Sequence, residues 1–106
     1  MSELEILREY LEANDIEYEW IDLDRECDKE GFITQLERHQ IIVFEDGKRI
    51  WDAVCHYGSY GYEEGLLEVY GKPVVMPEDG DSVCGWLTAE DVISRWEEYK
   101  SNGGHW

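Results

Sequence analysis

Five carboxylates occupy every second position of one short stretch, and their spacing could imitate a nucleic-acid backbone. If this stretch is extended, all five side chains project to one side of the chain, about 6.8 Å apart. Phosphates along one DNA strand have a similar separation. The alternative is a flexible acidic loop, in which Arg25 and Lys29 close local ion pairs that contribute little. The five residues are Asp22, Asp24, Glu26, Asp28 and Glu30.

Two neighbouring segments extend this acidic series. At about 100° per residue, one predicted helical face carries three glutamates, although for this helix alone an ordinary solvated face is the simpler interpretation. Two more glutamates alternate with apolar residues in a predicted strand. The predicted partner-binding surface therefore consists of Glu5, Glu9, Glu12, Glu17, Glu19, Asp22, Asp24, Glu26, Asp28 and Glu30.

The overall charge restricts the partners. The chain holds 26 acidic and 9 basic residues, for a formal net charge of −17, and the acids are spread along the sequence rather than gathered in a tail. Such a surface repels nucleic acid and anionic lipid, so we expect neither as a direct partner. A basic protein surface is the favoured partner, and a role of the charge in solubility alone is the alternative.

A glycine-broken loop, Gly58-Ser59-Tyr60-Gly61, is a second candidate site. Its backbone N–H groups and the Ser59 hydroxyl could approach a phosphate, and neighbouring tyrosines could stack on a base. The spacing matches neither a Walker loop nor a dinucleotide fingerprint, and tight turning is the commoner use of such glycines. The alternative ligand-binding residues are Arg49, His56, Tyr57, Ser59, Tyr60 and Tyr62.

The histidines and cysteines do not predict an enzyme or a metal site. The chain lacks the C-x-x-C and H-x-x-x-H spacings of zinc ligands. Cys55 and His56 are adjacent, so on a strand they point to opposite sides, although Cys84 with a distant histidine stays open. Three cysteines, an odd number, predict free thiols in a reducing cytoplasm. We therefore expect no catalytic residue, no metal and no cofactor.

A hairpin over residues 39–56 must position these groups. Asp46-Gly47 between two β-rich runs predicts a two-residue turn, because primed turns need positive φ at both central residues. On the second strand of this hairpin, the face of Trp51, Ala53 and Cys55 is the more apolar, so we expect this face to point inward. Asp52, Val54 and His56 then share the outer face.

The remaining elements complete an α+β domain. We expect helices over residues 2–13 and from residue 88 onward, because Ser2/Glu5 and Thr88/Asp91 are capping-box pairs. Strands are predicted over residues 16–21 and 83–87, and a short helix over 63–70 with Leu66, Leu67 and Tyr70 buried. The predicted fold is an antiparallel sheet of about four strands with both terminal helices packed on one face. Residues 1–100 form the single domain, and 101–106 are a flexible tail. Neither a secretory signal nor a membrane span is predicted.

The run WDAVCHYGSYGYEEGLLEVYG, followed by DSVCGWLTAEDVI, resembles a group of small uncharacterised acidic proteins encoded in phages and prophages of gut Firmicutes. The resemblance covers residues 38–94. It transfers no activity, but it implies the cytoplasm of a bacterial host cell. Small acidic phage proteins often antagonise host defence or host nucleic-acid enzymes, so the resemblance favours a binding protein over an enzyme.

Three functions follow from these observations. The first is an anti-CRISPR-like, DNA-mimicking inhibitor that occupies the basic surface of a host nucleic-acid-binding or defence protein. The second is an oligomeric protein that sequesters a small nucleotide or signal molecule at the Gly58–Gly61 loop. The third is a structural or assembly protein of a phage.

Overall fold

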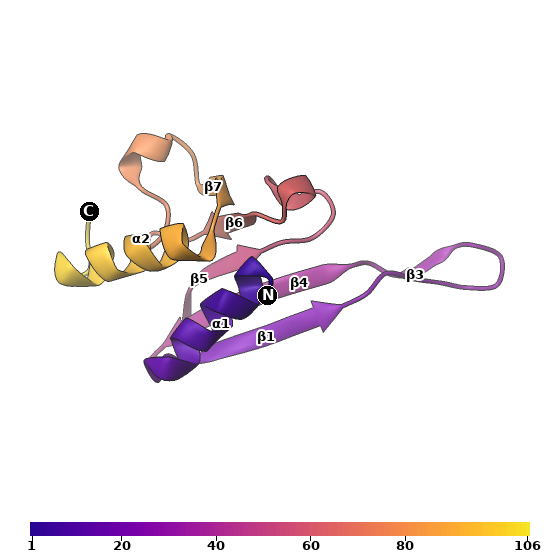
Figure 1. The fold of residues 1–106 in the computed structure, drawn as a ribbon, viewed down its shortest axis with the longest axis horizontal. Helices are drawn as coiled ribbons and strands as arrows, with labels where there is room; N and C mark the ends of the chain where they lie inside the picture. The colour runs from indigo at the N-terminus through magenta and orange to yellow at the C-terminus, as the bar shows by residue number, and fades with distance from the viewer.

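The computed structural model describes residues 1–106 and has the predicted α+β class, with more strands than the expected four (Figure 1). An antiparallel five-stranded sheet has the order β1-β4-β5-β6-β7. A separate pair, β2-β3, forms a small second sheet. The sheet strands are β1 (Tyr18–Leu23), β4 (Arg38–Glu45), β5 (Lys48–Val54), β6 (Leu67–Tyr70) and β7 (Val83–Leu87).

Helices α1 (Glu3–Ala13) and α2 (Ala89–Ser101) begin at the predicted caps and pack on one face of the sheet (Figure 1). Both capping boxes are formed, which satisfies backbone N–H groups at the start of each helix. The α1 stripe of Leu4, Leu7 and Leu11, which recur at the helical spacing, is buried in the core. Glu3 also accepts a hydrogen bond of 2.7 Å from the amide of Ala89, so α1 contributes to the capping of α2.

The predicted hairpin is confirmed as β4 and β5. Asp46 and Gly47 have φ values of 53° and 77°, the two positive angles that the primed turn requires. Trp51 and Ala53 point into the core, and Cys55 packs beside it. Asp52 lies on the outer face as expected, yet it is only 7% exposed. Its carboxylate accepts hydrogen bonds of 2.5 Å from both Gln40 and Arg49, and these contacts cover it.

The short helix predicted over residues 63–70 is wrong. Residues Tyr62–Glu64 form a single 3-10 turn, and the chain then enters strand β6. Leu67 and Val69 are buried while Tyr70 is exposed, which is the period of two expected of a strand. Pairing with β5 on one side and β7 on the other satisfies the backbone of this segment, and no local sequence signal reveals that pairing.

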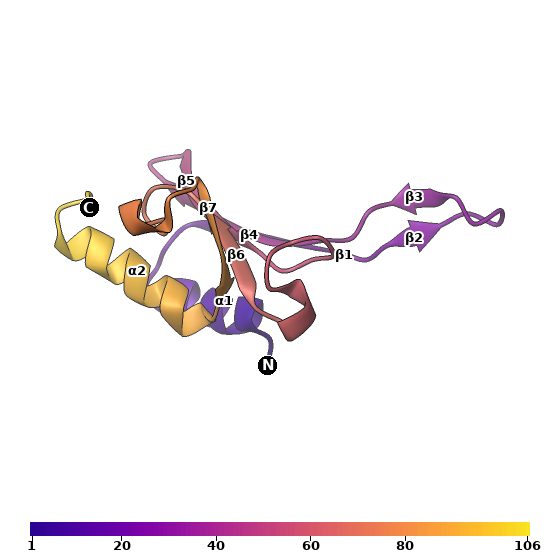
Figure 2. The ribbon, with the colours of Figure 1, turned by 90° about the horizontal axis from the view of Figure 1, so that it is seen from above.

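Between β1 and β4 the chain leaves the sheet as a narrow β arm, which Figure 2 shows projecting from the body. We call residues 24–37 the arm; it contains β2 (Glu26–Cys27) and β3 (Ile33–Gln35). The arm gives the molecule extents of 53 × 29 × 26 Å. It also accounts for residues 32–36, whose sequence favours no single element.

The arm corrects the prediction of one row of five carboxylates. β structure ends at Cys27, and the Asp28 carboxylate then accepts hydrogen bonds from the amides of Glu30 and Phe32. Asp28 therefore holds the turn at the tip, and Glu30 lies within that turn. The regular spacing does not continue beyond Glu26.

The C-terminal residues follow α2 directly. The indole N–H of Trp106 donates a hydrogen bond of 2.7 Å to the carbonyl of Lys72, and its ring contacts Tyr99. The flexibility of residues 101–106 stays a prediction. Neither helix combines the length and the apolar character that crossing a membrane would require.

Candidate functional site

All ten predicted carboxylates of the acidic surface are exposed, but they do not share one face. Tyr18 and Trp20 pack on the core, so the alternation of β1 places Asp22 on the helix side of the sheet. Glu17 and Glu19 therefore project from the opposite side. Glu5, Glu9 and Glu12 lie on α1, and Asp24, Glu26, Asp28 and Glu30 lie on the arm.

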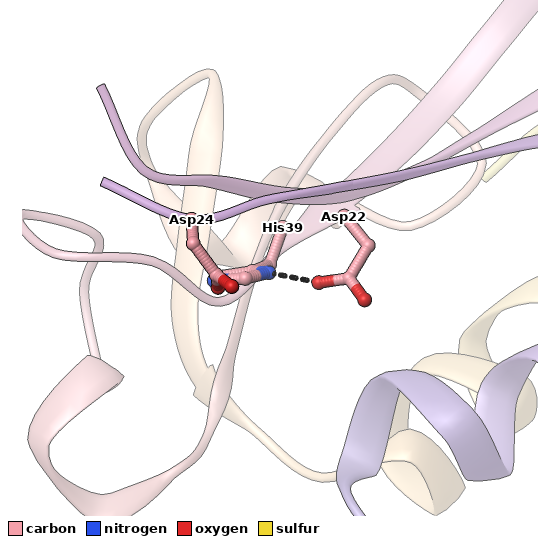
Figure 3. Close-up of side chains that lie close together, drawn as sticks. All are labelled: Asp22, Asp24 and His39. Carbon is pink, nitrogen blue, oxygen red and sulfur yellow. Dashed lines mark hydrogen bonds and ion pairs between the residues drawn. The ribbon is translucent and has the colours of Figure 1, made fainter. Parts of the chain in front are cut away.

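A cluster of three side chains ties the base of the arm together. In Figure 3 the imidazole of His39 lies between the carboxylates of Asp22 and Asp24. His39 Nδ1 is 2.6 Å from Asp22 Oδ1, and His39 Nε2 is 3.8 Å from Glu37 Oε2. Asp22 and His39 are directly paired across β1 and β4, so the sheet register brings these groups together.

These three residues are also the set that could hold a metal ion. Their ligand atoms lie within 4.8 Å of one another, and imidazole with carboxylates suits a divalent transition metal. A metal on His39 Nδ1 would replace the hydrogen bond to Asp22, whose carboxylate is itself exposed. The cluster was not predicted from the sequence because Asp22 and His39 are 17 residues apart, and only the β1–β4 register joins them.

A cavity of about 780 Å³ adjoins the cluster, between the start of α1 and the sheet. Asp22, His39 and Cys55 contribute to its wall, as does Arg8. Arg8 is already engaged, because its Nε donates to the Tyr18 hydroxyl at 2.9 Å and its guanidinium lies 4.6 Å from the Trp20 ring centre. Several carboxylates complete the lining, so the cavity disfavours an anionic ligand.

The three thiols differ in exposure, and this difference predicts their reactivity. Cys27 is exposed on the arm, whereas burial raises the pKa of Cys55 and of Cys84 and so reduces their thiolate fraction at neutral pH.

We expect a thiol reagent at pH 7 to label Cys27 at least about tenfold faster than the other two. The rates can be followed by mass spectrometry, and Cys27→Ser should remove the fast phase. Fast labelling of Cys55 would instead indicate an activated nucleophile.

The Gly58–Gly61 loop uses its polar groups internally. The Ser59 hydroxyl donates to the carbonyl of His56 at 2.7 Å and accepts from the His56 amide. The His56 ring accepts from the amide of His39, and the Tyr57 amide donates to Glu37 Oε2 at 2.9 Å. These bonds fix the loop against the base of the arm.

The predicted ligand-binding set is only partly brought together. His56, Tyr57, Ser59, Tyr60 and Tyr62 share the loop region, but Arg49 does not join them. Arg49 and His56 stand near opposite ends of β5, about 23 Å apart at strand spacing. Arg49 is bound to Asp52 instead, so the structure does not bring Arg49 to the loop.

One residue at this loop was not found from the sequence. Trp86 of β7 stacks on Tyr60, with ring centres 5.4 Å apart and an interplanar angle of 19°. The sequence predicts a strand for this segment but does not indicate which side of the strand the Trp86 ring faces. The neighbouring Gly85 was the available signal, because glycine within a strand often marks a close backbone approach.

Comparison of the chain with protein-family models, with curated proteins and with solved structures finds no match. The surfaces described above are therefore the basis for a functional assignment.

Proposed function

We propose that the protein is an acidic binding protein that occupies a basic, nucleic-acid-binding surface of another protein. The arm is the observation that carries this proposal. It extends away from the core and combines carboxylates with large apolar side chains that nothing in the chain covers (Figure 2).

The apolar side chains of the arm favour a protein as the partner. Phe32 and Leu36 are 71% and 73% exposed, and Ile33 is 50% exposed. Exposed apolar residues gathered on one small element are typical of interaction sites. On binding, such residues would supply the buried contacts, while the surrounding carboxylates would accelerate and orient association.

The charge favours a basic partner surface. Asp22, Asp24 and Glu26 are exposed along the base and first strand of the arm, within a chain of net charge −17. Surfaces that bind nucleic acid are the strongly basic surfaces of a cell, since they must neutralise phosphates. In the phage context that the resemblance implies, the partner would be a defence protein or nucleic-acid enzyme of the bacterial host.

The direct test is competition with nucleic acid. Immobilised protein should retain partners from a bacterial lysate, and an excess of a duplex oligonucleotide should displace them at constant salt. Retention should also weaken steeply as salt rises, because screening shortens the range of exposed charges to about 8 Å at physiological salt. Partners that duplex DNA and RNA both fail to displace would contradict the proposal.

A charge-matched pair of triple variants makes this test specific to the arm. Changing Asp22 and Asp24 to Asn and Glu26 to Gln should slow association with an isolated partner about tenfold, with a smaller effect on dissociation. The control changes Glu78, Glu90 and Glu98 to Gln, three exposed residues outside the arm, for the same change in net charge. An equal effect of both triple variants would mean that net charge alone acts and that the arm does not dock.

A further inference from the structure

Two aromatic pairs surround a depression of about 490 Å³ beside the base of the arm. Tyr60 stacks on Trp86, and Tyr57 contacts Tyr62 edge-on with ring centres 6.1 Å apart. Tyr57 is 82% exposed and Trp86 is 58% exposed. Four rings therefore border one hollow, and three of them, Tyr57, Tyr60 and Trp86, leave much of their surface in solvent. We call these residues the aromatic cluster.

The backbone holds the Tyr60–Trp86 pair in place. A side chain at Gly85 would collide with the Cβ atom of Tyr60, so only glycine permits this approach. The Trp86 amide donates to the Tyr60 carbonyl, and the Tyr60 amide donates to Glu68. Trp86 also has a φ of 56°, a left-handed conformation that a bulky L-residue resists. Because Trp86 is 58% exposed, burial of its ring compensates little of this strain, which points to a use for the ring at the surface.

The charges around the aromatic cluster favour a cation. Glu63 and Glu64 line the depression with the rings, and the sequence between Arg49 and Lys72 contains no lysine or arginine. Elsewhere the chain places its own cations on aromatic rings: Arg8 lies 4.6 Å from the Trp20 ring centre and Lys100 lies 5.1 Å from that of Trp96. At the aromatic cluster no such internal cation is available. An anion would meet the two glutamates and be repelled.

We propose that the aromatic cluster binds an arginine side chain of a partner protein. A guanidinium group is planar, so it can stack on an exposed ring while its N–H donors reach the carboxylates of Glu63 and Glu64. A lysine ammonium is attracted to the same rings, but it is not planar and so cannot stack on them. The site goes beyond the proposed function, since it requires an exposed arginine and not a nucleic-acid-binding partner. Tyr57 of the aromatic cluster donates a backbone hydrogen bond to Glu37, the last residue of the arm. One partner could therefore contact the arm and the aromatic cluster together.

The test uses two synthetic peptides of equal length and charge, one with three arginines and one with three lysines separated by glycines. Titration monitored by amide chemical shifts should show the arginine peptide binding the wild-type protein at least fivefold more tightly. The shifts should concentrate at residues 57–64 and 86. Equal affinity for both peptides, or shifts spread over the whole acidic surface, would overturn the proposal.

Replacing Trp86 by glycine tests the contribution of the ring to binding without destabilising the fold. Trp86→Gly removes the ring but favours the positive φ, so its melting temperature should equal or exceed that of the wild type. This variant should lose the preference for arginine over lysine. Tyr70→Ala, which removes an exposed tyrosine of β6 outside the aromatic cluster, should keep it. A Trp86→Gly protein that keeps the preference would overturn the proposal.

The preference for the arginine peptide can be tested independently of the role of the arm. The triple variant of Asp22, Asp24 and Glu26 should keep the preference for the arginine peptide even where it binds the partner slowly. Loss of the arginine preference in that variant would show general charge attraction and would count against the aromatic cluster.

Discussion

Replacing Gly71 by alanine is expected to destabilise the fold by about 4 kcal/mol, a large fraction of the stability of a domain of this size. Gly71 follows β6 with a φ of 122°, which lies outside the small left-handed region open to other residues. A Cβ atom there would also stand 2.7 Å from the Ile50 carbonyl oxygen and from Trp51 Cα. Both neighbours are backbone atoms of the central strand, so they cannot move without disturbing the core.

The control is Gly80→Ala. Gly80 also has a positive φ, 69°, but a Cβ atom there would meet no atom within 4 Å. Gly80→Ala should lower the unfolding free energy only by the cost of the left-handed conformation, about 1 to 2 kcal/mol. Urea unfolding of both variants measures the difference, and similar losses of stability would show that the contact with β5 is not close in solution.

The sequence predicted the elements that local chemistry defines. Both helices begin at capping boxes, and each box involves only residues three apart. The Asp46-Gly47 turn is likewise set by two adjacent residues whose backbone tolerates positive φ. Such signals can be recognised before any tertiary contact is known.

Strand β6 and the arm could not be predicted in this way. Leu66, Leu67 and Tyr70 fit a helical period about as well as Leu67 and Val69 fit a strand, and pairing with β5 and β7 decides between them. The arm buries little apolar surface, so its apolar residues follow no period that marks a buried face. Exposure of the carboxylates was predictable from charge, but their distribution over both sides of β1 depends on which side packs on the core.

The candidate sites depend on contacts between distant residues. Asp22 meets His39 through the β1–β4 register, and Tyr60 meets Trp86 where the loop is hydrogen-bonded to β7. A loop rich in glycine and tyrosine was recognisable as a candidate site. Its ligand could not be predicted, because Arg49 was expected beside the loop but is paired with Asp52, while Glu63 and Glu64 line the depression.

The second large effect is expected at the ion pair between Arg95 and Asp79. Arg95 Nη1 lies 2.8 Å from Asp79 Oδ2 and also donates to the carbonyl of Val74 at 2.9 Å, so it ties the loop before β7 to α2. The two side chains are only 17% and 16% exposed. Asp79→Asn leaves the guanidinium without its charged partner in this largely buried place, and we expect a loss of about 2 kcal/mol in unfolding free energy.

The exposed pair of Lys100 and Glu45 is the matched control. Its atoms are 2.9 Å apart, but both side chains are about half exposed. Glu45→Gln should therefore cost no more than about 0.5 kcal/mol. Equal losses for the two pairs would show that burial adds nothing to the Arg95–Asp79 interaction.

The stabilisation by Asp79 should depend on pH with a definite sign. Burial alone would raise the pKa of Asp79, but hydrogen bonds from Arg95 and from the Met76 amide outweigh it and hold the pKa below the usual value. A carboxylate whose pKa is lower in the folded state contributes fully above the pKa of the unfolded chain, about 3.9. The contribution is lost as pH falls through the folded-state pKa.

The measurement is the difference in unfolding free energy between the wild type and Asp79→Asn, taken from pH 7 down to pH 3. Taking the difference cancels the other carboxylates, whose protonation also relieves self-repulsion in a chain of net charge −17. The difference should stay near its full value down to about pH 5 and then shrink toward pH 3, because the wild-type carboxylate becomes neutral like the amide. A difference that stays constant, or that grows as the pH falls, would mean that the charge of Asp79 does not stabilise the loop.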